Sequence, residues 1–205
     1  MAISIPDRVV VFDYGEVISR SPSEADKDAL LALAGADPEA FWASYWRHRL
    51  DLDQGRLDVL SYWQLLADEV GARWSVSRIH ALWVADFRSW WSTEPGTLDL
   101  LEELHEGGTR LALLSNAGWD FAGPFRASPM AALFERMFVS AELDAVKPDP
   151  AIYREVAEAL GIPLERMVFV DNKVENTDAA AALGVTAHHF TGVDGLAAFL
   201  RGLAS

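Results

Sequence analysis

Five short apolar runs, each ending at or near polar residues, constrain the fold of this chain more than any other feature. They are the segments RVVVFD, RLALLSN, RMFVSAE, MVFVDN and VTAHHF. Segments with helical spacing lie between the later runs, so strands alternate with helices along this part of the chain. Apolar strands that alternate with helices are typical of a parallel sheet covered on both faces. The sequence therefore predicts an α/β fold built on a doubly wound parallel sheet.

The long interval between the first two runs contains no strand signal. Four segments with helical spacing follow one another there, and several begin with a Ser or Asp that is suited to cap a helix. Most connections between elements are far shorter, at about a dozen residues or fewer. We therefore predict a helical cap, residues 21–95, inserted after the first strand into a core formed by residues 1–20 and 96–205.

Composition limits the partners of the chain. The formal net charge is −14 over 205 residues, and such a charge repels nucleic acids and anionic membrane surfaces. A small anionic substrate remains compatible with it, because one pocket can be locally positive. The chain has no Cys and no long apolar run, so we expect a cytoplasmic protein without a membrane partner. The oligomeric state, monomer or homodimer, stays open.

Polar side chains stand at the ends of several predicted strands or just before predicted helices. In an open parallel sheet, ligands bind beyond the carboxyl ends of the strands. Each of these residues taken alone is explained by a turn or a helix cap. Their order along the chain favours a shared site. The residues are Asp13, Ser115, Asn116, Lys147, Asp171 and Asn172.

Four segments in this order, VVFDYGEVI, LLSN, KPDPAIY and FVDNKVENTDAAAALGV, carry a resemblance to a known family. The chain resembles the haloacid dehalogenase superfamily of hydrolases. The resemblance covers nearly the whole chain, including a helical cap between the first and second motifs. It implies a Rossmann-like core and hydrolysis through a covalent aspartyl intermediate.

The resemblance also implies the catalytic roles. Asp13 would attack the phosphorus or carbon of the substrate as a nucleophile. Ser115, with Asn116 and backbone N–H groups, would hold the transferring group. Lys147 would offset the negative charge of both the nucleophile and the substrate.

A magnesium ion is the cofactor that the resemblance implies. Its ligands would be Asp13, the backbone carbonyl of Gly15, and Asp171 or Asn172, all oxygen donors. Electrostatics agrees, because a phosphate dianion repels a carboxylate nucleophile and Lys147 supplies only one positive charge.

The sequence departs from the phosphatase pattern at Gly15, where the family usually has a second Asp as general acid and base. Such a group contributes about 10²- to 10⁴-fold to the rate. Another group could replace it, with Glu16, His48 and Tyr45 as candidates. Alternatively, the leaving group needs no proton because it is intrinsically good or because it is a halide. In an extended chain Glu16 would point to the face opposite Asp13, so we expect it to be a weak candidate.

Three functions follow from these features. The first is a Mg²⁺-dependent phosphatase acting on a small phosphorylated metabolite. The second is a metal-independent 2-haloacid dehalogenase, which the glycine at position 15 favours. The third is a binding protein with weak catalysis, because Gly15 and Asn172 both stand where the family has acids. Retention of Asp171 favours the first.

Selectivity is expected to come from the cap, where Arg49 is either a solvated residue of a helix face or an anion clamp. The candidates for substrate contacts are Gly15, Asn116, Tyr45, Trp46, Arg49 and Tyr62.

Overall fold

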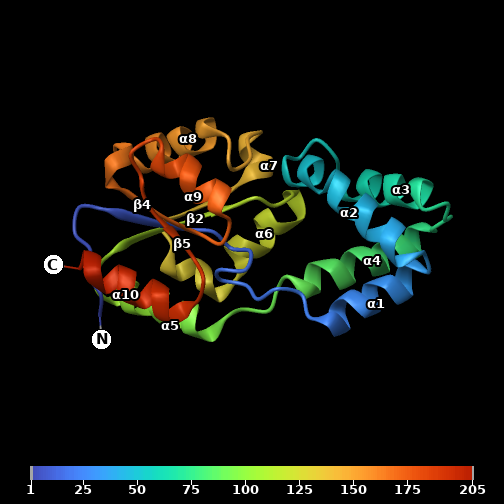
Figure 1. Ribbon diagram of the computed structural model, residues 1–205, viewed down its shortest axis with the longest axis horizontal. Helices are drawn as coiled ribbons and strands as arrows, with labels where there is room; N and C mark the ends of the chain where they lie inside the picture. The colour runs from blue at the N-terminus through green and yellow to red at the C-terminus, as the bar shows by residue number, and fades with distance from the viewer. Residues whose placement is uncertain (1, 205) are drawn as a thin grey trace.

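A sheet of five parallel strands forms the centre of the structure, a computed structural model that describes residues 2–204 (Figure 1). The strand order is β3-β2-β1-β4-β5. The strands are β1 (Val9–Phe12), β2 (Arg110–Ser115), β3 (Arg136–Val139), β4 (Met167–Asp171) and β5 (Thr186–His189). The predicted α/β fold with a parallel sheet is confirmed. β1, the first strand in the sequence, lies in the middle between β2 and β4.

Both faces of the sheet are buried, and β1 shows why its sequence is continuously apolar. Successive side chains of a strand point to opposite faces. Val10 and Phe12 belong to one hydrophobic cluster, and Val9 and Val11 belong to the other. The first cluster includes residues of α5 (Pro95–Glu106), α6 (Trp119–Ala127) and α10 (Val193–Leu203). The second includes residues of α8 (Pro150–Leu160) and α9 (Val174–Ala181). Short helical segments complete the connections, namely η1 (Pro129–Leu133), α7 (Ser140–Leu143) and η2 (Leu164–Arg166).

Four helices lie between β1 and α5 and gather at one end of the molecule (Figure 1). They are α1 (Glu24–Ala34), α2 (Pro38–Asp53), α3 (Val59–Glu69) and α4 (Val76–Ser89). Each begins after a residue whose side chain accepts a hydrogen bond from a backbone N–H of the first turn, as the sequence predicted for helix caps. The capping residues are Ser23, Asp37, Asp58 and Ser75.

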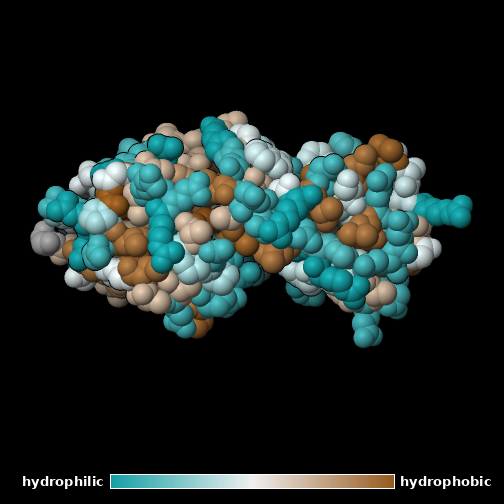
Figure 2. Space-filling model, turned by 90° about the horizontal axis from the view of Figure 1, so that it is seen from above, coloured by the Kyte–Doolittle hydropathy of each residue, from teal (hydrophilic) through white to brown (hydrophobic). Residues whose placement is uncertain are grey.

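The four helices have a hydrophobic cluster of their own, centred on Phe41, Trp63 and Leu66. Figure 2 shows a narrow waist between this smaller lobe and the lobe that contains the sheet. The predicted boundaries of the cap, residues 21 and 95, remain a prediction.

Two chain segments connect the lobes, and they run side by side. Ser19 and Thr93 form an antiparallel bridge. The backbone N–H of Arg20 donates to the carbonyl of Ser92 at 2.6 Å, and that of Glu94 donates to the carbonyl of Ile18 at 2.8 Å. This short double connection fixes where the helical lobe faces the carboxyl edge of the sheet. Within residues 2–204, no helix is both long enough and apolar enough to span a membrane.

Candidate active site

Three side chains from distant parts of the chain meet at the carboxyl edge of the sheet. The Lys147 ammonium lies 2.7 Å from Asp13 Oδ1 and 2.7 Å from Asp171 Oδ2. It also donates to the carbonyl of Leu114 at 3.0 Å. Asp13 directly follows β1 and Asp171 ends β4, and these two strands are neighbours in the sheet. The parallel pairing therefore brings two carboxylates to one place, and Lys147 is the cation between them.

Burial makes this group of charges unusual. The side chain of Lys147 is 1% exposed, that of Asp171 is fully buried and that of Asp13 is 10% exposed. Burial raises the pKa of the Asp13 carboxyl to about 6; Lys147 opposes this rise and the charge of Asp171 adds to it. Burial acts to lower the pKa of Lys147, but the two carboxylates outweigh it and the pKa is raised. Lys147 is therefore positively charged when both acids are ionised.

Asn116 holds the loop that carries the lysine. Its side-chain Nδ2 donates to the carbonyl of Lys147 at 2.9 Å, and its Oδ1 accepts the backbone N–H of Lys147 at 2.9 Å. Asn116 also lines the pocket beside Ser115, the last residue of β2. In the structure the amide positions Lys147, and its predicted contact with the substrate stays a prediction.

Asp171 is held by several donors. Its Oδ1 accepts the backbone N–H of Lys173 at 2.8 Å, and its Oδ2 accepts the amide of Asn176 at 3.0 Å in addition to Lys147. Sequence reasoning missed Asn176, which lies five residues after Asp171. The sequence did contain a signal for this residue, because Asn176 belongs to the same segment as Asp171, FVDNKVENTDAAAALGV, and lies in the first turn of α9.

Gly15 lies in open space. A Cβ added there would meet one atom within 4 Å, Asp13 Oδ2 at 4.0 Å. Packing therefore leaves room for a side chain at this position, and steric exclusion does not explain the glycine.

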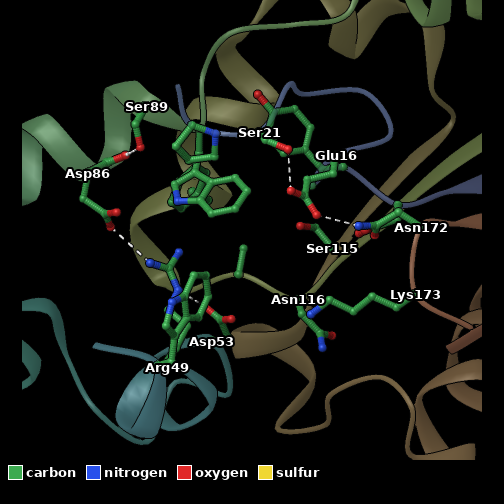
Figure 3. A pocket seen from close by; sticks show the side chains of 18 of the residues that line it. Glu16, Ser21, Arg49, Asp53, Asp86, Ser89, Ser115, Asn116, Asn172 and Lys173 are labelled. Carbon is green, nitrogen blue, oxygen red and sulfur yellow. Dashed lines mark hydrogen bonds and ion pairs between the residues drawn. The ribbon is translucent and has the colours of Figure 1, made fainter. Parts of the chain in front are cut away.

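Glu16 points into the pocket, which corrects the expectation from an extended chain. Its φ is 59°, in the left-handed region, and this turn reverses the alternation of side chains. Its carboxylate accepts hydrogen bonds from Ser21 Oγ and, at 2.7 Å, from Asn172 Nδ2 (Figure 3). Sequence reasoning had no signal for this, because positive φ at a glutamate is rare.

The oxygen atoms near Asp13 fit a hard cation such as Mg²⁺. Asn172 Oδ1 is buried and has no hydrogen-bond partner within residues 2–204. Its Nδ2 is turned toward Glu16, so the acceptor oxygen is free for a ligand. No group of three or more His, Cys, Asp or Glu side chains suited to a metal occurs in the described part of the chain. A cation here would therefore need neutral oxygen atoms, such as Asn172 Oδ1 and the Gly15 carbonyl, beside the carboxylates.

The pocket at this site has a volume of about 670 Å³ and lies between the sheet edge and the helical lobe. This volume is within the usual range for small-molecule sites. Figure 3 shows Arg49, Asp53 and Asp86 across the pocket from Glu16 and Asn172.

The predicted cap residues take different places. Arg49 and Tyr45 line the pocket, and so does Trp46, whose side chain is exposed. Tyr62 is fully buried in the cluster of the helical lobe, where its hydroxyl donates to the carbonyl of Tyr45 at 2.9 Å. The structure therefore gives Tyr62 a packing position behind Tyr45 rather than a place at the pocket. Periodicity alone did not distinguish the two faces.

The fold and the site define an α/β protein with an aspartate, a lysine and a second aspartate joined at the carboxyl edge of its sheet. The family model described as haloacid dehalogenase-like hydrolase matches residues 8–184, and the chain belongs to this family. The predicted resemblance is thus confirmed.

Individual relatives are distant. A phosphoglycolate phosphatase of Pseudomonas putida is 32% identical over 92 residues, which are 44% of this chain and 34% of that protein. The chain spans about a third of the length of the first curated relatives it matches.

Solved structures share the fold. A haloacid dehalogenase family enzyme of Bacteroides thetaiotaomicron, in complex with magnesium and inorganic phosphate, is 23% identical with a TM-score of 0.69 and covers 88% of this chain and 92% of its own. The L-2-haloacid dehalogenase RSc1362 is 21% identical with a TM-score of 0.65. The match covers 91% of this chain and 86% of that dehalogenase.

Proposed function

We propose that the protein is a Mg²⁺-dependent phosphatase that hydrolyses a small phosphorylated metabolite through a phosphorylated Asp13. The observation that carries this proposal is the buried contact of Lys147 with both Asp13 and Asp171 at 2.7 Å. The magnesium and phosphate bound to the enzyme of Bacteroides thetaiotaomicron support the same chemistry.

In the first step an oxygen of Asp13 attacks phosphorus, and the bond from phosphorus to the leaving-group oxygen breaks. The leaving-group oxygen takes its proton from water, because Gly15 supplies no acid. Lys147 Nζ holds Asp13 Oδ1, so Oδ2 is the oxygen left to attack. Ser115 and the backbone N–H groups after β2 would bind the phosphoryl oxygens. Water then hydrolyses the aspartyl phosphate and releases inorganic phosphate.

A bound Mg²⁺ would supply charge compensation between the phosphate and the nucleophile. Its ligands would be Asp13, the Gly15 carbonyl and Asn172. Asp171 would join them if Lys147 moved away from its carboxylate. Lys147 alone balances one of the two buried carboxylates, so the approach of a dianion needs this additional charge.

The test uses a panel of phosphomonoesters with and without chelator. We expect turnover that requires Mg²⁺ and is lost in Asp13→Asn. Lys147→Arg, which keeps the charge but not the compact ammonium, should lower kcat strongly. Equal turnover by the wild-type protein and Asp13→Asn would refute the proposal.

A dehalogenase is the second candidate, and the glycine at position 15 favours it because a halide leaves without a proton. In that reaction Asp13 would attack the carbon that carries the halogen. Halide release from a short 2-haloacid, unaffected by EDTA and lost in Asp13→Asn, would establish it. A third candidate, a binding protein with weak catalysis, requires tight binding of a phosphorylated ligand without hydrolysis.

A further inference from the structure

The side of the pocket opposite Asp13 carries an ion cluster centred on Arg49. Its Nε donates to Asp53 Oδ1 at 3.0 Å, and its Nη1 donates to Asp86 Oδ2 at 3.1 Å. Nη1 also donates to the Tyr45 hydroxyl at 2.6 Å, and this hydroxyl donates to Asp86 Oδ1 at 2.7 Å. One cation therefore faces two acids, so the cluster has a formal charge of −1.

Burial strengthens the cluster. The side chains of Arg49, Asp53 and Asp86 are 14%, 13% and 9% exposed. Charges in such surroundings are screened less than on an open surface. A substrate anion could bind Arg49 only if the guanidinium broke its contact with Asp53 or Asp86. Otherwise the anion would lie next to both carboxylates. Arg49 is therefore not an open anion clamp.

The rest of the pocket does not reverse this charge. Six acidic and four basic side chains line it, a formal net charge of −2 before any cation binds. Lys147 is bound to Asp13 and Asp171, and Lys27 pairs with Glu24 at 2.7 Å. The charged lining residues are Asp13, Glu16, Asp26, Asp53, Asp86, Glu175, Lys27, Arg49, Lys147 and Lys173. Burial raises the pKa of Asp53 to about 6, and the charge of Lys173, which is exposed, acts to lower it.

Carboxylates accept hydrogen bonds and cannot donate them when ionised, and each offers about four acceptor positions. The contacts described above use two positions on Asp86 and one on Asp53. Hydroxyl or amine groups of a ligand are the natural partners for the positions that remain. Ser89 lies beside Asp86, and its hydroxyl donates to the Asp86 backbone carbonyl at 2.7 Å (Figure 3).

We propose that the substrate is a phosphomonoester whose leaving group carries hydroxyl or amine donors and no second negative charge, and that Asp53 and Asp86 select it. The proposal rests on the proposed phosphatase function and names its substrate class. A carboxylate on the substrate in addition to the phosphate, as in phosphoglycolate, would approach two buried acids and be disfavoured.

The test compares glycerol 1-phosphate with 3-phosphoglycerate, which differ by a hydroxymethyl group in place of a carboxylate. We expect kcat/KM of the wild-type protein with Mg²⁺ to favour glycerol 1-phosphate by about tenfold or more, as like charges oppose the other ligand. Asp53→Asn and Asp86→Asn should each reduce this ratio severalfold. Asp68→Asn, an equal charge change at an exposed position of α3 outside the pocket lining, should leave the ratio unchanged.

Binding separates this proposal from the proposed function. Calorimetric titration of the Asp13→Asn variant in the presence of Mg²⁺ measures the affinity for each ligand without turnover. We expect glycerol 1-phosphate to bind more tightly than 3-phosphoglycerate. Selective binding without hydrolysis of any phosphomonoester by the wild-type protein would refute the phosphatase and retain the selectivity. Equal or tighter binding of 3-phosphoglycerate, or no binding of either ligand, would overturn the proposal.

Discussion

At the scale of single residues, positions 15 and 16 distinguish this site from the phosphatase pattern. Gly15 stands where an acid is expected, yet its surroundings have room for a side chain near Asp13 Oδ2. Glu16 occupies a left-handed conformation that suits glycine better, and its carboxylate holds the amide of Asn172. The two residues together place an acid next to Asn172, whose oxygen is proposed to hold Mg²⁺, and leave no acid at position 15.

Gly15→Asp should create a general acid near the nucleophile. We expect kcat for alkyl phosphates, which are poor leaving groups, to rise by about 10- to 10²-fold, part of the usual contribution of such a group. Aryl phosphates, which leave without a proton, should gain little. Steady-state kinetics on both substrates measures this. Gly15→Asn is the matched control, and an equal gain in that variant would contradict the role of the proton.

Glu16→Gly should relieve backbone strain that Glu16→Ala retains. The left-handed conformation costs a residue other than glycine about 1 to 2 kcal/mol, so the glycine variant should be the more stable by about 1 kcal/mol. Denaturant unfolding of the two variants compares them directly. Both should bind Mg²⁺ about tenfold more weakly in a calorimetric titration, because both lose the group that orients Asn172. Unchanged Mg²⁺ affinity would show that Asn172 needs no such support.

At the scale of elements, Glu69 at the end of α3 holds two helices of the helical lobe, α2 and α3, together. It accepts hydrogen bonds from Ser44 at 2.7 Å, His48 at 2.9 Å and Arg47 at 3.0 Å, all on α2. The bonds from Ser44 and His48 lower the pKa of Glu69 from 4.5 to about 2. The same contacts make His48 part of the helical lobe, and His48 is not among the described residues that line the pocket with Asp13.

This shift gives the cap a defined dependence on pH. Because the pKa is lower in the folded state, Glu69 stabilises the fold above about pH 4.5, and this contribution is lost as the pH falls from about 4.5 toward 2. The difference in unfolding free energy between the wild-type protein and Glu69→Gln should therefore shrink from pH 6 to pH 3. Chemical denaturation at both values measures it. Asp68→Asn serves as the control, and a difference that stays constant with pH would contradict the assignment.

At the scale of the whole molecule, Lys147 joins the strands of the sheet edge through charge. Its ammonium contacts residues that follow or end β1 and β4 and the carbonyl of Leu114 in β2. A buried ion that loses its partner is strongly destabilising.

Lys147→Met should therefore destabilise the protein by about 3 to 5 kcal/mol at pH 8 with chelator present, because two buried carboxylates then face each other. The loss should be smaller at pH 5, because the pKa of Asp13 is about 6 even beside Lys147 and rises further without the lysine, so Asp13 takes up a proton. Adding Asp13→Asn to Lys147→Met should restore part of the stability at pH 8. Thermal unfolding at both pH values measures these changes, and an equal loss at pH 5 and pH 8 would contradict the electrostatic cause.

Much of the fold followed from local patterns. The run VVVF predicted a buried strand, and Ser or Asp at the start of several segments predicted helix starts between the first two strands. These features depend on neighbours along the chain, such as side-chain alternation and the capping of backbone N–H groups. The convergence of Asp13, Lys147 and Asp171 was also predictable, because the carboxyl ends of parallel strands share one edge.

By itself the sequence determined which residues form the strands and helices and which polar groups reach the sheet edge. Only the tertiary structure decided that Glu16 turns into the pocket, that Tyr62 lies behind Tyr45, and that Arg49 is held by Asp53 and Asp86. The physical reason is that a side chain's role depends on a backbone angle and on charges from other elements. The periodicity of one helix or strand contains no information about that angle or about those charges.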